Sequence, residues 1–169
     1  MGISEHTLKT IIKSTQKYKK SDWKDVNICL FGNLYIRDNA KNYINKLCFD
    51  YNHISMKFFQ NMSSYVTCFD INGKDGAIPY DLGYEIPYKS LFNKFDILIN
   101  GGTIEHVNSH KNAQYICFKN VHDLCKLNSI IIHLAPEVGS WPYHCSNHYT
   151  NEFFHLLAKL AHNPNLMWR

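Results

Sequence analysis

An acidic side chain and an imidazole follow one of the most apolar segments of the chain. The segment FDILIN (95–100) is followed by Gly101 and Gly102, and then by Glu105 and His106. A carboxylate can orient an imidazole whose pKa lies near neutrality, so Glu105 and His106 are candidates for general acid–base catalysis. The alternative is that Glu105 caps a turn or helps to close a pocket while His106 packs, because most residues that line pockets are not catalytic.

A second group of candidate residues lies in the segment WPYHCSNHY (141–149), which combines aromatic rings with imidazoles. His144 in this segment is a third candidate for a general base. The segment follows a predicted strand on the side of the sheet where ligands bind, so it is also a candidate lid. A packed surface loop is the equal alternative.

Ten histidines raise the question of a metal ion. His106 and His110 are four residues apart, as are His144 and His148, and Cys145 adds a thiolate donor. Four ligands of these types would suit zinc. The spacing lacks a Cys-x-x-Cys knuckle and a helical His-Glu-x-x-His, so ordinary surface or core histidines are the simpler interpretation. We therefore predict no metal site.

The hydrophobic pattern predicts the elements that must position these residues. Apolar runs predict strands at 26–31, 65–70, 77–82, 95–100 and 129–135, and a 3.6-residue periodicity predicts helices at 4–20, 40–48 and 111–126 and after Thr150. A proline limits 77–82 to a short or edge strand. Strands that are apolar throughout need cover on both faces, which helices supply. We predict an α/β fold, a three-layer sandwich around a mainly parallel sheet.

Small or acidic residues follow the predicted strands. They are Gly32 and Asn33 after the first, Asp70 after the second, Asp81 near the third, Asn100, Gly101 and Gly102 after the fourth, and Glu137 after the fifth. In an open parallel sheet, ligands bind beyond the carboxyl ends of the strands, near the point where strand order reverses. A carboxylate such as Asp70 suits ribose hydroxyls, and glycines let a ligand approach the backbone. Ordinary turn chemistry is the alternative for Asp70.

Three segments, in this order and spacing, resemble the class I S-adenosylmethionine-dependent methyltransferases. They are VTCFDINGKDGAIPYDLGYEIP (66–87), FDILINGGTIEHV (95–107) and SIIIHLAP (129–136). The similarity is strongest to the group whose fourth strand runs into Glu-His-Val and which later carries a pattern like HCSNHYTNEFF (144–154). The resemblance covers about residues 26–162 and implies a Rossmann-like fold that transfers a methyl group to an acceptor, which stays unidentified.

The resemblance also implies a set of cofactor-binding residues. Asp70 would hold the ribose of S-adenosylmethionine, Asp81 with Leu82 would lie beside the adenine, and Asn100 with Gly101 would border the methionine and methyl end. Gly32, Asn33 and Ile71 complete the expected set. If the acceptor needs deprotonation, His106 or His144 is the candidate base.

The sequence departs from this family in its first loop. The segment LFGNLYIRDN (30–39) has the single glycine Gly32 where such enzymes carry a glycine-rich loop, and Asp70 follows at more than the roughly 20 residues of a dinucleotide fingerprint. A second hypothesis is therefore a non-catalytic binding or assembly protein that kept the fold. The chain ends at Arg169, so we expect the final antiparallel hairpin to be absent and an exposed sheet edge to be covered, for example in a homodimer.

The length of 169 residues fits one domain, with an N-terminal helix in 1–22 and a Rossmann-like core in 23–169. No apolar segment approaches the roughly 18 residues of a membrane span, and the six cysteines show no disulfide spacing. We expect a cytoplasmic protein with no membrane association. Six lysines concentrate positive charge near the N-terminus, namely Lys9, Lys13, Lys17, Lys19, Lys20 and Lys24. They predict either nucleic-acid contacts or, more simply, a solvated helix face.

Overall fold

A four-stranded parallel sheet forms the centre of the molecule. The computed structural model describes residues 2–18 and 23–161. The strands are β2 (Asn27–Phe31), β4 (Tyr65–Phe69), β5 (Phe95–Gly101) and β6 (Cys125–Leu134), in the order β4-β2-β5-β6. Every pairing in this sheet is parallel. Because β4 and β5 flank β2 on opposite sides, the strand order reverses at β2, which is where α/β sheets bind ligands.

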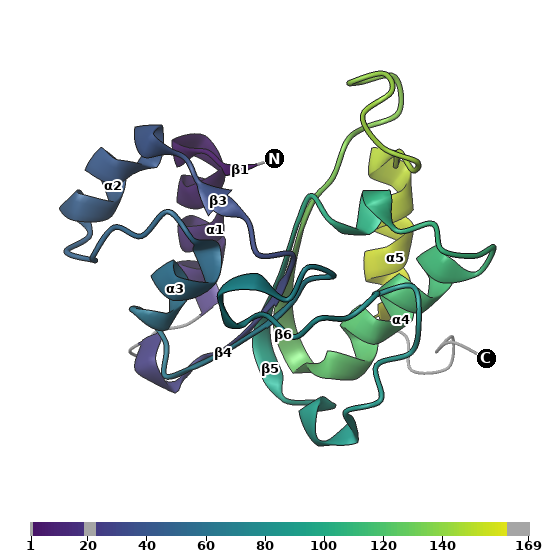
Figure 1. Ribbon diagram of the computed structural model, residues 1–169, viewed down its shortest axis with the longest axis horizontal. Helices are drawn as coiled ribbons and strands as arrows, with labels where there is room; N and C mark the ends of the chain where they lie inside the picture. Colours follow the sequence, from purple (N-terminus) through teal and green to yellow (C-terminus); the bar gives the residue numbers. More distant parts are fainter. Residues whose placement is uncertain (1, 19–22, 162–169) are drawn as a thin grey trace.

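Helices cover both faces of the sheet, which confirms the predicted three-layer α/β architecture. Figure 1 shows α1 (Glu5–Tyr18), α2 (Lys41–Lys46) and α3 (Ser55–Gln60) on one side and α4 (Ala113–Leu124) and α5 (Asn151–Ala161) on the other. Short 3-10 helices lie between them at Trp23–Asp25, Asp38–Ala40, Lys74–Gly76, Lys89–Leu91 and Ile104–His106. The last of these, η5, directly follows β5 and carries Glu105 and His106.

Successive side chains of β2 enter two different hydrophobic cores. Ile28 and Leu30 pack with the side chains of α1 and α3, whereas Cys29 and Phe31 pack with α4. This alternation is what a strand covered on both faces requires, since neighbouring side chains point to opposite sides. The apolar sequence of β2 therefore results from burial on both faces of the sheet, as we predicted from the sequence.

The helix predictions hold for the longer elements. The predicted stripe of α1 is buried, and its Thr15 hydroxyl donates to the Ile11 carbonyl at 3.0 Å. Thr150 caps α5, because its hydroxyl accepts the backbone N–H of Phe153 at 3.1 Å. The C-terminal end of the predicted helix 4–20 extends beyond Tyr18, outside the described residues.

Several local predictions are wrong. Residues 77–82 form no strand, only one parallel bridge between Ile78 and Phe69, because Pro79 has no N–H to continue a ladder. A two-stranded sheet of β1 (Gly2–Ile3) and β3 (Tyr35–Ile36) and the helix α3 were not predicted. Within the described part of the chain, β6 is an edge strand and no antiparallel strand follows it.

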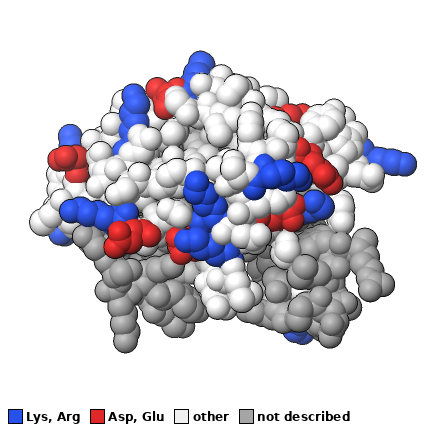
Figure 2. Space-filling view, turned by 90° about the horizontal axis from the view of Figure 1, so that it is seen from below, with Lys and Arg blue, Asp and Glu red and all other residues white. Residues whose placement is uncertain are grey.

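Acidic and basic side chains are interspersed on the surface. On the face in Figure 2, Lys and Arg side chains lie beside Asp and Glu in several places. Lys9 pairs with Glu5 at 2.5 Å, and the side chains of Lys17, Lys19 and Lys20 lie outside the described residues. Nucleic-acid binding therefore stays a prediction. Among the described helices, each is too short or too polar to cross a bilayer.

Candidate functional site

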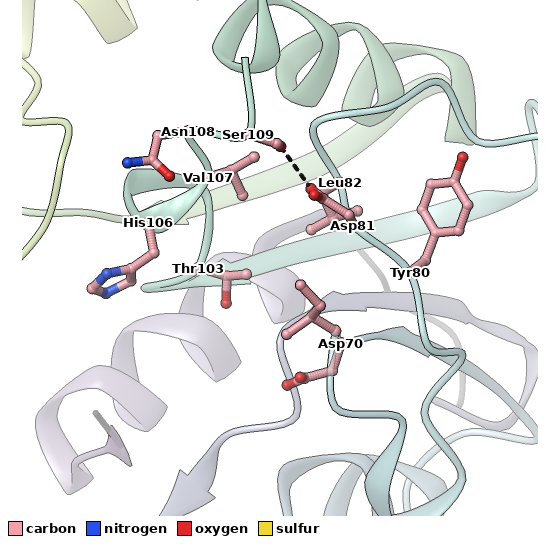
Figure 3. A pocket seen from close by; sticks show the side chains of 10 residues that line it. Asp70, Tyr80, Asp81, Leu82, Thr103, His106, Val107, Asn108 and Ser109 are labelled. Carbon is pink, nitrogen blue, oxygen red and sulfur yellow. Dashed lines mark hydrogen bonds between the residues drawn. The ribbon is translucent and has the colours of Figure 1, made fainter.

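A cleft of about 300 Å³ lies at the edge of the sheet, next to the residues that follow β4 and β5. Its lining comprises Asp70, Ile71, Tyr80, Asp81, Leu82, Thr103, His106, Val107, Asn108 and Ser109. Figure 3 shows Tyr80 and His106 on opposite sides of the cleft, with Asp81, Leu82 and Thr103 between them. The volume is at the lower end of the range of small-molecule sites, about 300–1,000 Å³.

Asp70 lines the cleft and also holds two loops together. One carboxylate oxygen accepts the backbone N–H of Asn33 at 2.8 Å, and the other accepts that of Asn72 at 3.0 Å. The turn chemistry that was the alternative interpretation is therefore present. It leaves room for a ligand, because an ionised carboxylate offers about four acceptor positions and these bonds use two.

Asp81 is the second carboxylate of the cleft. Its Oδ1 atom accepts the Gly83 N–H at 2.8 Å and the Ser109 hydroxyl at 3.2 Å, the bond drawn in Figure 3. The segment that follows is fixed to α4 by Asn120, whose amide donates to the carbonyls of Leu82 at 3.1 Å and Tyr84 at 2.8 Å. Asn120 is buried, with 1% of its surface exposed. The Asn120 side chain of α4 thus fixes the position of the loop that carries Asp81.

Four of the eight predicted cofactor-binding residues do not line the cleft. Asn33 accepts the Met56 N–H at 3.2 Å through its side chain, so it supports the start of α3. The Asn100 oxygen accepts the N–H groups of Thr103 and Ile104, at 3.2 and 3.1 Å. Both asparagines therefore have structural roles.

The two glycines of this set are covered by side chains. A β-carbon on Gly32 would meet the Thr103 hydroxyl, and one on Gly101 would meet a methyl group of Leu34. The Thr103 hydroxyl donates to the Phe31 carbonyl at 2.9 Å, which holds it there. The space that was expected to admit a ligand is thus occupied by the protein, and the open cleft lies on the Asp70–Asp81 side.

Glu105, His106 and His144 converge, although one comes from a loop almost forty residues away. One potential ligand atom from each residue lies within 4.8 Å of the other two. The rings of His106 and His144 meet edge to face with centroids 5.0 Å apart, and His144 stacks on Trp141 at 3.7 Å. The three predicted catalytic residues therefore form one cluster, and His106 places it at the rim of the cleft.

The Glu105 carboxylate has an unusual environment. Its residue is fully buried, at 0% exposure, and neither oxygen accepts a hydrogen bond from another residue that the structure describes. Burial raises the pKa of Glu105, and its own backbone N–H and nearby His148 offset this shift in part. Burial, and then the neighbouring His144, lower the pKa of His106. Thr103 precedes η5 without a side-chain cap bond, and the Glu105 side chain does not cap this turn either.

The remaining donors of the zinc alternative are not members of this group of three. His110 bonds the Gly83 carbonyl at 2.8 Å and contacts the ring of Tyr84. Cys145 and His148 contact each other, with 3.8 Å between Sγ and Nε2, and the Cys145 thiol donates to the Asn147 carbonyl. Only His106 and His144 of the original set come together around a common point.

The candidate lid 141–149 is tied to the site by Asn147. The Glu105 carbonyl accepts the Asn147 backbone N–H at 3.1 Å and its side-chain amide at 3.2 Å. Trp141 and Tyr143 have positive φ angles of 49° and 62°, which are uncommon for residues with side chains. The segment is therefore an anchored, strained loop next to the cleft.

Sequence reasoning missed several residues of the cleft, namely Tyr80, Thr103, Val107, Asn108 and Ser109. These residues lie within or directly after the motifs 66–87 and 95–107, and this position in the sequence could have identified them. Comparison of the chain with protein-family models and with curated proteins finds no significant match.

Proposed function

We propose that the protein is an S-adenosylmethionine-dependent methyltransferase that holds the adenosine portion of its cofactor in the cleft. The observation that carries this proposal is that two carboxylates, Asp70 and Asp81, line one cleft beside the strand-order reversal at β2. Carboxylates accept hydrogen bonds from ribose hydroxyls and from an exocyclic amine, and this position in the sheet favours nucleotide-like ligands.

The remaining residues of the site suit a methyl transfer that depends on alignment. Such a reaction needs the cofactor and acceptor held in line, which is what a cleft between fixed loops provides. His106 is at the rim of the cleft, and burial lowers its pKa, which favours the neutral imidazole that a general base requires. The acceptor is unidentified.

A second candidate is a non-catalytic protein that binds a nucleoside or assembles with a partner. The covered glycines favour it, since Thr103 and Leu34 occupy the space expected for the methionine portion of the cofactor. Binding of the whole cofactor requires the flexible Leu34 side chain to adopt another rotamer. Adenosine alone requires no such change.

Isothermal titration with S-adenosylmethionine, S-adenosylhomocysteine and adenosine separates the two candidates. The methyltransferase proposal expects both cofactor forms to bind at least tenfold more tightly than adenosine, about 1.4 kcal/mol. It also expects Leu34→Ala to strengthen cofactor binding while leaving adenosine binding unchanged. Equal affinity for all three ligands supports the non-catalytic candidate. No heat with any of them overturns nucleoside binding altogether.

The cellular setting belongs to the same proposal. All six cysteines are free, which fits a reducing compartment such as the cytoplasm. The edge strand β6 is partly exposed, with Ile131 at 39%, and a homodimer that extends the sheet there would cover it. Sedimentation velocity tests the homodimer, and a monomer at micromolar concentration contradicts it.

A further inference from the structure

Two imidazoles and one buried carboxylate are brought together by segments that are far apart in the sequence. Glu105 and His106 are on η5, and His144 is in the loop after β6. Their candidate ligand atoms lie within 4.8 Å of one another. We propose that Glu105, His106 and His144 bind one divalent transition-metal ion of the zinc or ferrous type, at the rim of the cleft.

The environment of Glu105 is the first reason for a ligand. An ionised carboxylate that is fully buried without hydrogen bonds is expensive, so buried charges are normally paired or bound to metals. Neither oxygen of Glu105 has a partner among the other described residues, and the same holds for the buried Nε2 atom of His144. Unsatisfied atoms on two side chains of one cluster are explained together by a cation between them.

The donor set is the second reason. Two imidazoles and one carboxylate are the protein ligands of open catalytic zinc sites and of mononuclear ferrous sites. Ligands of one tetrahedral zinc ion, each at about 2.0–2.2 Å from it, lie about 3.3 Å apart. The cluster must therefore contract by at most about 1.5 Å, which small rotations of side chains can supply.

The surroundings are consistent with ordered ligands. Trp141 stacks on His144 with an angle of 5° between the rings, and Asn147 ties its loop to the Glu105 backbone. Because His106 also lines the cleft, the ion would lie where it could act as a Lewis acid on a bound molecule. The inference does not depend on the proposed cofactor. With the ion bound, His106 and His144 would be ligands, and neither would act as the general base.

The test is titration of the full chain, freed of metal by a chelator, with Zn²⁺ and with Co²⁺. We expect one ion per chain, and at least 100-fold weaker binding in Glu105→Gln and in His144→Ala. His155→Ala is the matched control, because His155 is an exposed histidine on α5 that is not a member of the cluster, and we expect this variant to bind as the parent does. Binding that is equally strong in Glu105→Gln, or no binding of either ion, overturns the proposal.

The Co²⁺ spectrum identifies the ligands. The proposed set contains no sulfur, so a thiolate-to-cobalt charge-transfer band that disappears in Cys145→Ser would show that a different site is present and would overturn this one. Near-ultraviolet circular dichroism of each metal-free variant confirms that lost binding does not reflect unfolding. Titration of the parent with S-adenosylhomocysteine in chelator tests the proposed function separately, because the metal proposal makes no claim about that affinity.

Discussion

The hydroxyl of Thr103 lies over the α-carbon of Gly32, where a β-carbon would otherwise be, and donates to the carbonyl of Phe31. This contact joins the loop after β5 to the end of β2. The absence of a side chain at Gly32 therefore makes room for the Thr103 side chain, not for a ligand. Gly32 has a φ angle of +90°, a conformation that residues with side chains rarely adopt.

Gly32→Ala should therefore destabilise the fold strongly. The positive φ angle costs about 1–2 kcal/mol for alanine, and the overlap with Thr103 adds about 1–3 kcal/mol. Urea denaturation measures the free energy of unfolding. Gly139→Ala is the matched control, since Gly139 has a φ angle of +84° with no atom within 4 Å of its β-carbon position. This variant should lose only the free energy that the positive φ angle costs. If both variants lose the same free energy, the contact with Thr103 has no energetic weight.

The sheet could be predicted from sequence because burial on both faces leaves mainly apolar runs. Residues 26–31 and 95–100 are such runs, and both are central strands. Residues 77–82 resembled a strand in composition, yet the segment pairs with β4 through Ile78 alone. Local composition therefore identified all four strands of the sheet, and it also predicted one strand, at 77–82, that does not form.

The site was only partly predictable, because its contacts connect distant segments. Asp70 and Asp81 were found from their positions after apolar runs. The support of α3 by Asn33, and the approach of His144 to Glu105, depend on how loops cross in space. Sequence spacing between these residues carries no such information, and for the same reason it did not indicate that the Thr103 side chain covers Gly32.

Asp81→Asn should weaken binding of S-adenosylhomocysteine at least tenfold. Asparagine keeps the oxygen that accepts the Gly83 N–H and the Ser109 hydroxyl, so the loop stays in place while the charge is lost. Isothermal titration gives the affinity. Asp75→Asn, which removes a carboxylate outside the cleft lining, is the control and should bind as the parent does. Equal affinities in the two variants would remove Asp81 from the site.

His133 should make stability depend on pH. Burial lowers its pKa from 6.5 to about 4, where the ring packs against Phe118 and Phe154. The unfolded chain takes up a proton below pH 6.5 and the folded chain does not until about pH 4. Stability is therefore lost as the pH falls between these values, by up to about 3 kcal/mol.

The measurement compares urea denaturation at pH 7 and pH 4.5 in the parent and in His133→Phe, which has no ionisable group. The variant should lose less free energy between the two pH values. His155→Ala, which removes an exposed imidazole, should behave as the parent does. A loss in His133→Phe as large as that in the parent would assign the pH dependence to other groups.

Glu105→Gln should stabilise the metal-free protein at neutral pH. The raised pKa of Glu105 means that the folded state disfavours its ionised form, so this residue's contribution to stability is present at low pH and is lost as the pH rises through the folded pKa. The uncharged amide of glutamine has nearly the same shape and costs less to bury than an unpaired carboxylate, so we expect a gain of about 1 kcal/mol or more. Thermal unfolding in chelator measures this gain. Added Zn²⁺ should then make the parent more stable than Glu105→Gln, because only the parent retains the carboxylate that binds the ion. A variant that is less stable than the parent in chelator would show that the Glu105 carboxylate is already satisfied in the folded state without any ion.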